Sequence, residues 1–372
     1  MAQLEKRPHS AYVDRKVESG VWKLERIPAR VLGLARALEV YRATRKSDLI
    51  THGWFGDNST FCPPLWWDLA IGSGACGLGC RACFLMLTFR TMRDPSRHVL
   101  YSNVEDFRDA TARWLLSKQR QSFHTLGLGI DRSDSLLYEG VVGHARELIP
   151  MFMDPGRNPR GCYLILLTKS TNVHYLPPAR VRNGPVAITF SLNPECIADL
   201  WEGKDSLTGE RITPSIASRL ESSIEAQRMG YEVRWRVDPI FTPIGWEDAY
   251  EAFFAEAARI GARPHFVTLG TYREKNHQLD YWRRYWGLPK MEWTPAQLEQ
   301  SGTHFHVEER GRKVVYETIR RMIERHLPES FVALCRETYR VRRATGLCGS
   351  ECVCLKGSPR STASLVQLEQ RQ

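Results

Sequence analysis

The sequence predicts an α/β fold, a partial (β/α)6 barrel of the TIM type with an N-terminal cap and a C-terminal extension. Between residues 65 and 275, short apolar runs alternate with polar loops and stretches of helical periodicity, the pattern of a parallel sheet joined by crossover helices. The chain has 372 residues, enough for one large α/β domain with appended segments. We therefore expect a basic cap over residues 1–60, the barrel over residues 61–275 and the extension over residues 276–372.

Six apolar runs are the candidate strands of the sheet. Each is short and rich in β-branched or aromatic residues, and each is bounded by polar or glycine-containing loops. They span residues 65–71, 123–130, 162–168, 186–192, 232–237 and 266–269. In such a fold, functional side chains gather on the loops at the carboxyl ends of the strands.

Stretches with helical periodicity lie between these runs. After Pro214, the residues Ile216, Leu220 and Ile224 share one helical face, and Gly230 follows as a stop signal. A helix of this kind crosses over the sheet to the next parallel strand. The candidate helices span residues 104–117, 135–153, 214–229 and 246–260, and residues 29–43 in the cap.

The sequence predicts little regular structure in the C-terminal extension. A hairpin is expected over residues 307–316 and a helix over residues 317–326. The last dozen residues are rich in Ser and Gln, which is typical of a frayed tail.

Composition predicts a soluble globular protein, with 42% hydrophobic and 25% charged residues. The formal net charge of +10 suits a partner rich in phosphate, and the alternative is a soluble protein that happens to be basic. The N-terminus lacks the apolar core of a secretory signal, and no run approaches the roughly 18 apolar residues of a membrane span. We therefore expect a cytoplasmic protein with no membrane partner, whose ten cysteines bind metal or stay reduced.

Three cysteines, Cys76, Cys80 and Cys83, stand at C-x3-C-x2-C spacing in a glycine-rich loop that follows the first candidate strand. Three thiolates this close together suit three irons of a [4Fe–4S] cluster and leave the fourth iron open to a substrate or cofactor. The alternative, structural or zinc-binding thiols, predicts a fourth ligand at finger-like spacing. The loop therefore favours an iron–sulfur enzyme.

This spacing resembles that of the radical S-adenosylmethionine superfamily, and later segments resemble the spore photoproduct lyase family. The resemblance runs from about residue 62 to 275 and more weakly to about 355. It implies that the open iron binds the amino and carboxylate groups of S-adenosylmethionine, which an electron from a donor such as flavodoxin or ferredoxin cleaves to a 5′-deoxyadenosyl radical. The matching segments are Ser133-Asp-Ser-Leu-Leu, His144-Ala-Arg-Glu-Leu-Ile-Pro150, Leu166-Leu-Thr-Lys-Ser-Thr-Asn-Val173, Ser191-Leu-Asn-Pro-Glu195, Asp238-Pro-Ile and Gly245-Trp-Glu-Asp248.

Several polar residues in those segments are candidates for binding the cofactor. Lys169 and Ser191 fall at the carboxyl ends of adjacent candidate strands, where a cation and a hydroxyl suit a carboxylate, and the resemblance makes them cofactor-holding positions. Asp238 and Asn193 either reach a ribose hydroxyl or cap the following turns. Ser133, in the first matching segment, joins the set by the same resemblance.

The chain departs from the lyase pattern at three positions. The lyase carries tyrosines beside its third cysteine, whereas this chain has Ala82 and Phe84, which have no O–H to pass a hydrogen atom. Asp131 stands where the lyase has its hydrogen-donating cysteine. Cys196 is a candidate substitute donor on the active face, and the alternative is one more small buried residue.

A second group of cysteines, Cys335, Cys348, Cys352 and Cys354, lies near the C-terminus. It is a plausible four-ligand site for zinc or for a second iron–sulfur cluster. The alternative is a set of reduced, partly packed cysteines.

Basic and aromatic residues mix in the extension, where they suit phosphates and stacked bases. In the lyase a hairpin in this region meets DNA, and Arg312, Lys313 and Tyr316 correspond to it; a solvated basic face is the alternative. The sequence thus predicts a radical S-adenosylmethionine enzyme that repairs or modifies a nucleic acid, most simply DNA. Two rivals remain: the same chemistry on RNA, a peptide or a small metabolite, and a non-enzymatic metal-bearing nucleic-acid-binding protein.

Overall fold

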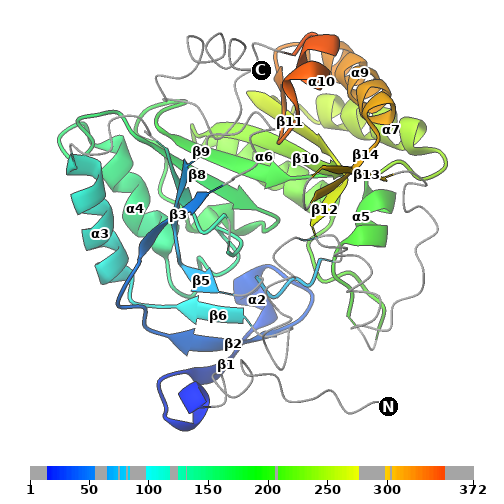
Figure 1. Cartoon of the computed structure of the whole chain (residues 1–372). Helices are drawn as coiled ribbons and strands as arrows, with labels where there is room; N and C mark the ends of the chain where they lie inside the picture. Colours follow the sequence, from blue (N-terminus) through cyan, green and yellow to red (C-terminus); the bar gives the residue numbers. More distant parts are fainter. Residues whose placement is uncertain are drawn as a thin grey trace.

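The computed structural model describes residues 15–54, 65–73, 76–80, 83, 98–117, 125–130, 132–205, 208–275, 298–301 and 304–347. A curved sheet with the strand order β15-β11-β10-β9-β8-β7-β4-β3 forms the centre of this part of the chain (Figure 1). From β4 to β15 every neighbouring pair is parallel, while β3 pairs antiparallel with β4 at one edge. The predicted parallel sheet is confirmed.

All six predicted strands are present, with small shifts at their ends. Most of their described apolar side chains are buried. The strands are β4 (Leu65–Leu69), β7 (Thr125–Leu128), β8 (Tyr163–Thr168), β9 (Val186–Ser191), β10 (Glu232–Ile240) and β11 (Phe266–Thr271).

The sheet extends beyond residues 61–275 on both sides. β3 (Ile50–Trp54) comes from the segment predicted to be a cap, and β15 (Phe331–Leu334) comes from the predicted extension. β15 pairs with β11 in parallel register, and the N–H of Cys335 continues the ladder to the carbonyl of Leu269 at 2.7 Å. Within the described residues β3 and β15 are the two edges, so hydrogen bonds leave the barrel open.

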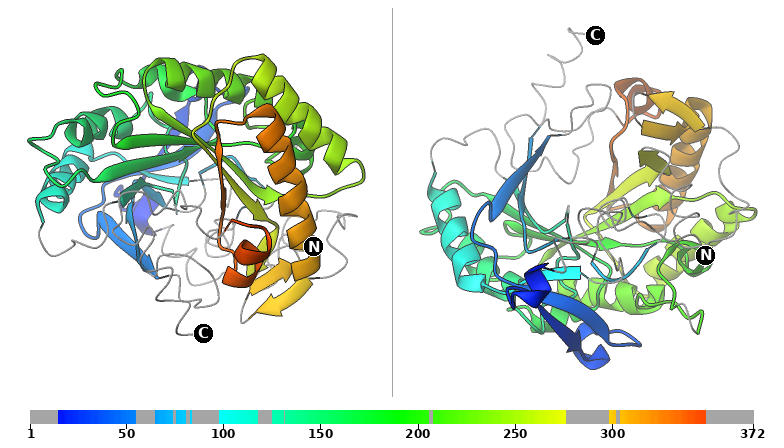
Figure 2. Two further views of the ribbon diagram at one scale, coloured as in Figure 1. Left: turned by 90° about the horizontal axis from the view of Figure 1, so that it is seen from above. Right: turned by 60° about the horizontal axis from the view of Figure 1, so that its bottom comes forward.

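Helices cover the outer side of the curved sheet, one after another along the arc (Figure 2). Helices α4, α6 and α9 pack on the strands directly, and α7 packs on α9. The five helices on this side are α3 (Val104–Leu116), α4 (His144–Met153), α6 (Ile216–Arg228), α7 (Trp246–Arg259) and α9 (Glu309–His326). No helix in the described residues is both long and apolar enough to cross a membrane.

The predicted helix over residues 135–153 is present only in its second half. Residues 135–143 form turns, and Gly143 adopts φ 81° at the N-terminus of α4, a left-handed conformation that ends the turns and excludes a continuous helix. The carboxylate of Glu139 then accepts hydrogen bonds from the N–H groups of Ala145 and Arg146, at 2.9 and 2.8 Å. A side chain outside the helix therefore caps its first turn.

The predicted helix over residues 29–43 is wrong. Only α2 (Ala29–Leu32) forms, because Gly33 at φ 64° closes it, and the chain continues as β2 (Leu38–Ala43). β2 lies in a second sheet with the order β1-β2-β6-β5, which includes β1 (Lys23–Ile27), β5 (Gly72–Ser73) and β6 (His98–Tyr101).

The predicted hairpin over residues 307–316 is also wrong. Residues from Glu309 onward already belong to α9, which buries Val315, Ile319 and Ile323 along one face. A hairpin lies just before it, formed by β13 (Leu298–Ser301) and β14 (His304–Val307) in a small sheet with β12 (Arg273–Lys275). After β15, the short helix α10 (Tyr339–Ala344) is the last described element.

Candidate functional site

Lys169 and Ser191 meet at the carboxyl ends of two neighbouring parallel strands. Lys169 directly follows β8, and Ser191 is the last residue of β9. The ammonium group of Lys169 donates a hydrogen bond to the hydroxyl of Ser191, and its Nζ lies 3.4 Å from Oε1 of Glu202. The structure thus brings the two predicted cofactor residues together at the edge of the sheet where the sequence placed them.

The backbone around the two residues is held by a buried carboxylate. Oδ2 of Asp134 accepts a hydrogen bond from the N–H of Lys169 at 2.6 Å, and Oδ1 accepts from the hydroxyl of Thr168 at 2.7 Å. The same Oδ1 accepts from the N–H groups of Leu136 and Leu137, each at 3.0 Å. Asp134 therefore fixes the turn that presents Lys169.

The cysteine loop follows β5 and lies beside the same strand ends. The hydroxyl of Tyr138 donates to the carbonyl of Cys76 at 2.7 Å, and the N–H of Cys83 donates to the carbonyl of Cys80 at 3.1 Å. Cys76, Cys80 and Cys83 are all half-buried. Hydrogen bonds to its backbone thus anchor the loop, and its three cysteines are neither fully buried nor fully exposed.

The electrostatics of the thiols show that they lie close together. Burial raises the pKa of Cys76 well above its usual range, and the charges of Asp134, Cys80 and Cys83 raise it further. Burial raises the pKa of Cys80 to about 12, with Lys169 acting against it. Thiols such as Cys76 and Cys80 become thiolates only beside added positive charge, which a bound cluster of iron ions supplies.

Backbone N–H groups are aimed at two of the sulfur atoms. The N–H of Leu78 donates to the Cys76 sulfur, and the N–H of Gly203 donates to the Cys80 sulfur. Hydrogen bonds of this kind favour thiolate ligands and tune iron–sulfur clusters, so the donor set fits a [4Fe–4S] cluster. In the described part of the chain no three His, Cys, Asp or Glu side chains are arranged to hold one metal ion; thiolates of a cluster each bind a different iron and so stand further apart.

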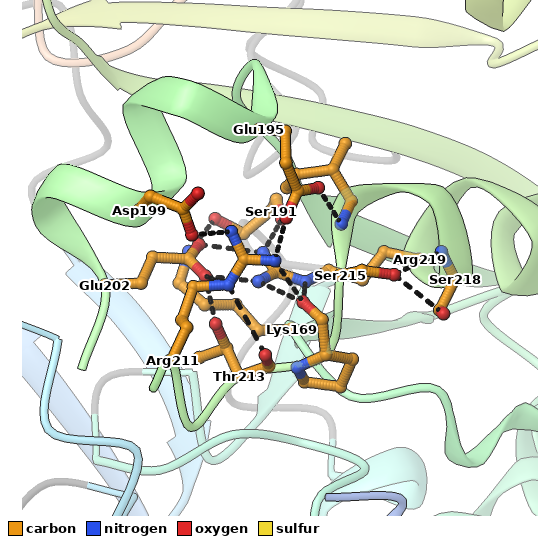
Figure 3. Close-up of polar contacts among 12 residues, drawn as sticks. Lys169, Ser191, Glu195, Asp199, Glu202, Arg211, Thr213, Ser215, Ser218 and Arg219 are labelled. Carbon is orange, nitrogen blue, oxygen red and sulfur yellow. Dashed lines mark hydrogen bonds and ion pairs between the residues drawn. The ribbon is translucent and has the colours of Figure 1, made fainter. Parts of the chain in front are cut away.

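A buried ion-pair network lies beside Lys169 (Figure 3). Arg219, on α6, is fully buried and forms a two-pronged pair with the carboxylate of Glu202, with Nη1 to Oε1 at 2.8 Å. Nη1 of Arg219 also donates to the carbonyl of Ser191 at 3.1 Å. Burial alone would raise the pKa of Glu202, but Arg219 and Lys169 hold it at about 2, so Glu202 is a carboxylate.

The segment after helix α5 (Glu195–Trp201) completes the network. Arg211 pairs with Glu195 and with Asp199, the latter at 2.9 Å, and the hydroxyl of Thr213 donates to Glu202. Sequence periodicity did not predict roles for Glu202 or Arg219, because charged residues beside apolar ones usually face solvent. The available hint was that Arg219 stands next to Leu220, which belongs to the buried face of α6.

Asp238 and Asn193 are committed to neighbouring protein groups. Oδ2 of Asp238 accepts from Arg236 at 2.8 Å and from Arg273 at 2.9 Å. Oδ1 of Asn193 accepts from the hydroxyl of Tyr250 at 2.8 Å, and its Nδ2 donates to a backbone carbonyl. Both lie at the carboxyl ends of β9 and β10, on the same edge of the sheet as Lys169 and Ser191.

Ser133 is buried, and its hydroxyl lies 3.2 Å from Nε2 of His98. Its loop follows β7, on the same edge of the sheet as Lys169.

Cys196 lies in the first turn of α5 and is exposed, so the alternative of a buried small residue is wrong. Ala82, Phe84 and Asp131 lie outside the described residues.

Cys335 is buried at the end of β15. Its sulfur accepts hydrogen bonds from Arg236 at 3.0 Å and from Arg273 at 3.4 Å, so it belongs to the cluster of charges around Asp238. The other members of the predicted second metal site, Cys348, Cys352 and Cys354, lie outside the described residues.

The predicted nucleic-acid residues lie on helix α9, not on a hairpin. Arg312 is buried and joins the hairpin strand β13 to the helix through Glu299, at 2.6 Å. Tyr316 is buried too, with its hydroxyl bonded to Thr271 and Glu337. Lys313 pairs with Glu309 one turn away, at 2.6 Å. Arg312 and Tyr316 therefore hold the fold together, and the prediction that they contact nucleic acid is corrected.

Solved structures share this fold, although no protein-family model matches the chain and no curated protein matches its sequence. A spore photoproduct lyase complexed with dinucleoside spore photoproduct matches with a TM-score of 0.63 at 18% identity, over 80% of this chain and 82% of the lyase chain. A mutant of that lyase with bound AdoMet and dinucleoside spore photoproduct matches with a TM-score of 0.62 at 18% identity, over 80% and 82% of the two chains. The chain thus has the fold of spore photoproduct lyase.

Proposed function

We propose that the chain is a radical S-adenosylmethionine enzyme that acts on a nucleic acid, most simply on DNA. The observation that carries the proposal is the meeting of the three-cysteine loop with Lys169 and Ser191 at the carboxyl edge of an open parallel sheet. A solved structure with this fold contains AdoMet together with a dinucleoside photoproduct. Barrel folds carry their active sites at the carboxyl ends of their parallel strands.

Each residue has a defined task in this proposal. Cys76, Cys80 and Cys83 hold a [4Fe–4S] cluster, while the ammonium of Lys169 and the hydroxyl of Ser191 bind the carboxylate of S-adenosylmethionine. When bound, the cluster and cofactor supply a 5′-deoxyadenosyl radical that takes a hydrogen atom from the substrate. Glu202 holds Lys169 in place from the protein side, at 3.4 Å.

Positive charge supports a nucleic-acid substrate and an acidic electron donor. The formal net charge of +10 attracts phosphate and also suits the acidic surface of a flavodoxin or ferredoxin. Among the described strands, β3 and β15 are the two edges of the sheet, and no hydrogen bonds close the barrel between them. Repair or modification of a base is the reaction class that fits these features.

The departures from the lyase pattern indicate that the substrate radical is quenched differently here. Ala82 and Phe84 provide no tyrosine hydroxyl, and Asp131 provides no thiol. Cys196 is exposed and lies five residues after Ser191, which ends β9. We propose Cys196 as the hydrogen donor. These departures also keep RNA, a peptide or a small metabolite as the second candidate substrate class.

Transfer of deuterium tests the proposal. Reconstituted protein is given S-adenosylmethionine, a reductant and oligonucleotides deuterated on the thymine methyl or on the sugar. Deuterium that appears in 5′-deoxyadenosine from DNA supports the proposed substrate. Formation of 5′-deoxyadenosine that never carries deuterium from DNA would move the activity to the second class.

A further inference from the structure

The turn formed by Glu202 and Gly203 presses directly against the cysteine loop. A Cβ atom at Gly203 would lie 1.7 Å from the carbonyl oxygen of Leu78 and 2.8 Å from the carbonyl carbon of Gly79. Both atoms belong to the backbone, so a rotamer change cannot relieve the clash. The φ of Gly203 lies outside the left-handed region, so backbone conformation does not require glycine here. The close approach of the two backbones does.

The turn is held on the cysteine loop from two other sides. The N–H of Ile212 donates to the carbonyl of Gly203 at 2.8 Å, which closes the loop that starts at the turn. Asp205, two residues further on, forms an ion pair with Arg36, which comes from the segment between α2 and β2. The position of Gly203 against Leu78 is therefore fixed by the fold around it.

Two electrostatic influences of opposite sign reach Cys80 from this turn. The N–H of Gly203 donates to the Cys80 sulfur and stabilises negative charge on it. The carboxylate of Glu202 opposes negative charge on the same sulfur, although Arg219 and Lys169 offset part of its effect. Reduction of a cluster adds one negative charge, so hydrogen bonds to its sulfurs favour the reduced form and a nearby carboxylate disfavours it.

We infer that the turn of Glu202 and Gly203 is a positioning element that sets the reduction potential of a cluster held by Cys80. Gly203 raises the potential through its N–H, and Glu202 lowers it through its carboxylate. Glu202 also fixes the ammonium of Lys169 toward Ser191, so the same turn links the potential to the site that holds the cofactor carboxylate. The inference rests on the proposed function and adds residues that lie outside the cysteine motif.

The midpoint potential of the reconstituted cluster, followed by electron paramagnetic resonance during a redox titration, tests the inference. Gly203→Ala pushes the turn away from Leu78, so we expect the ratio of reduced to oxidised cluster at a fixed potential to fall about tenfold, a shift of about 59 mV to more negative potential for one electron. Glu202→Gln keeps the shape of the side chain and removes its charge, so we expect a shift to more positive potential. Gly209→Asn is the matched control, because Gly209 lies in the same loop with open space around it.

Opposite shifts of the midpoint potential in Gly203→Ala and Glu202→Gln distinguish the inferred role of the turn from general damage to the site. Two variants that keep the wild-type potential, or that both shift in the same direction, would overturn it. If Gly203→Ala takes up no cluster, the sign of the Glu202→Gln shift decides alone. A wild-type chain that takes up no cluster overturns the proposed function itself, whereas a normal wild-type cluster with unmoved variants overturns this inference only.

Discussion

The ammonium of Lys169 donates a hydrogen bond to the hydroxyl of Ser191 across the ends of strands β8 and β9. Neighbouring parallel strands end at one edge of a sheet, so residues far apart in sequence become partners there. Lys169 is only about a quarter exposed and Glu202 is almost fully buried, which keeps the ammonium directed at this edge. In our proposal, this pair binds the carboxylate of S-adenosylmethionine.

Lys169→Met is expected to weaken the binding of S-adenosylmethionine by about 10- to 100-fold, since a charge-assisted hydrogen bond contributes about 1.5–3 kcal/mol. Equilibrium binding to the reconstituted protein measures the effect. Lys313→Met is the matched control, because Lys313 pairs with Glu309 on the surface of α9. Equal affinities of Lys169→Met and wild type would remove Lys169 from the cofactor site.

Arg219→Met is expected to lower the free energy of unfolding by about 3–5 kcal/mol, because it leaves the buried carboxylate of Glu202 without its main partner. Urea unfolding of the cluster-free protein measures the loss. The double variant Arg219→Met with Glu202→Gln is expected to recover part of it, since no buried charge then remains unpaired. A loss below about 1 kcal/mol in the single variant would show that the pair is exposed to water.

Asp238→Asn is expected to reduce stability in a pH-dependent way. Burial alone would raise the pKa of Asp238, but Arg273 and Arg236 outweigh burial and hold the pKa well below its usual range. A carboxyl with a lowered pKa in the folded state stabilises the fold above its unfolded-state pKa, about 3.9, and this stabilisation is lost as the pH falls below that value. The variant is therefore less stable at neutral pH by about 3 kcal/mol, and the difference narrows below about pH 4.

Unfolding of the cluster-free protein in urea between about pH 3.5 and 8 measures this difference. Glu256→Gln is the control, because Glu256 forms an exposed pair with Arg259 and such pairs contribute little. A stability difference that widens in acid would contradict the assigned direction of the Asp238 pKa.

Cys196→Ala is expected to leave cleavage of S-adenosylmethionine intact and to change what becomes of the substrate radical. The exposed thiol donates a hydrogen atom to that radical in our account, so its loss diverts the radical to other products. Chromatography of the products, with 5′-deoxyadenosine counted in parallel, measures both effects. Cys162→Ala is the control, because Cys162 is buried and directly precedes β8, at the opposite end of that strand from Lys169. An unchanged product distribution in Cys196→Ala would rule out its role.

The sequence predicted the elements that depend on local pattern and missed those that depend on distant partners. Apolar runs located six strands, and strand ends located Lys169 and Ser191, because both follow from periodicity and topology. The helix over residues 29–43 failed because Gly33 ends it and the apolar residues after it pair with β6 instead. Strand β15 was missed because four residues after a long helix carry no period of their own.

The sequence did not predict the ion-pair network of Glu202 and Arg219, for a related reason. Glu202 and Arg219 are 17 residues apart in the chain and become partners only when α6 crosses over the sheet. The hairpin was expected about ten residues too late because the helical period of residues 309–326 begins with charged residues that resemble a turn. Burial of Arg312 against Glu299 and Glu337 likewise required the folded arrangement.

Formation of 5′-deoxyadenosine tests the central claim most directly. Wild-type protein reconstituted anaerobically with iron and sulfide is given dithionite and S-adenosylmethionine, beside the variant Cys80→Ala and the control Cys196→Ala. We predict 5′-deoxyadenosine from the wild type and from Cys196→Ala, and none from Cys80→Ala, which lacks one of the three thiolates that hold the cluster. A wild type that binds the cluster and forms no 5′-deoxyadenosine, or a Cys80→Ala variant that forms as much as the wild type, would contradict the account.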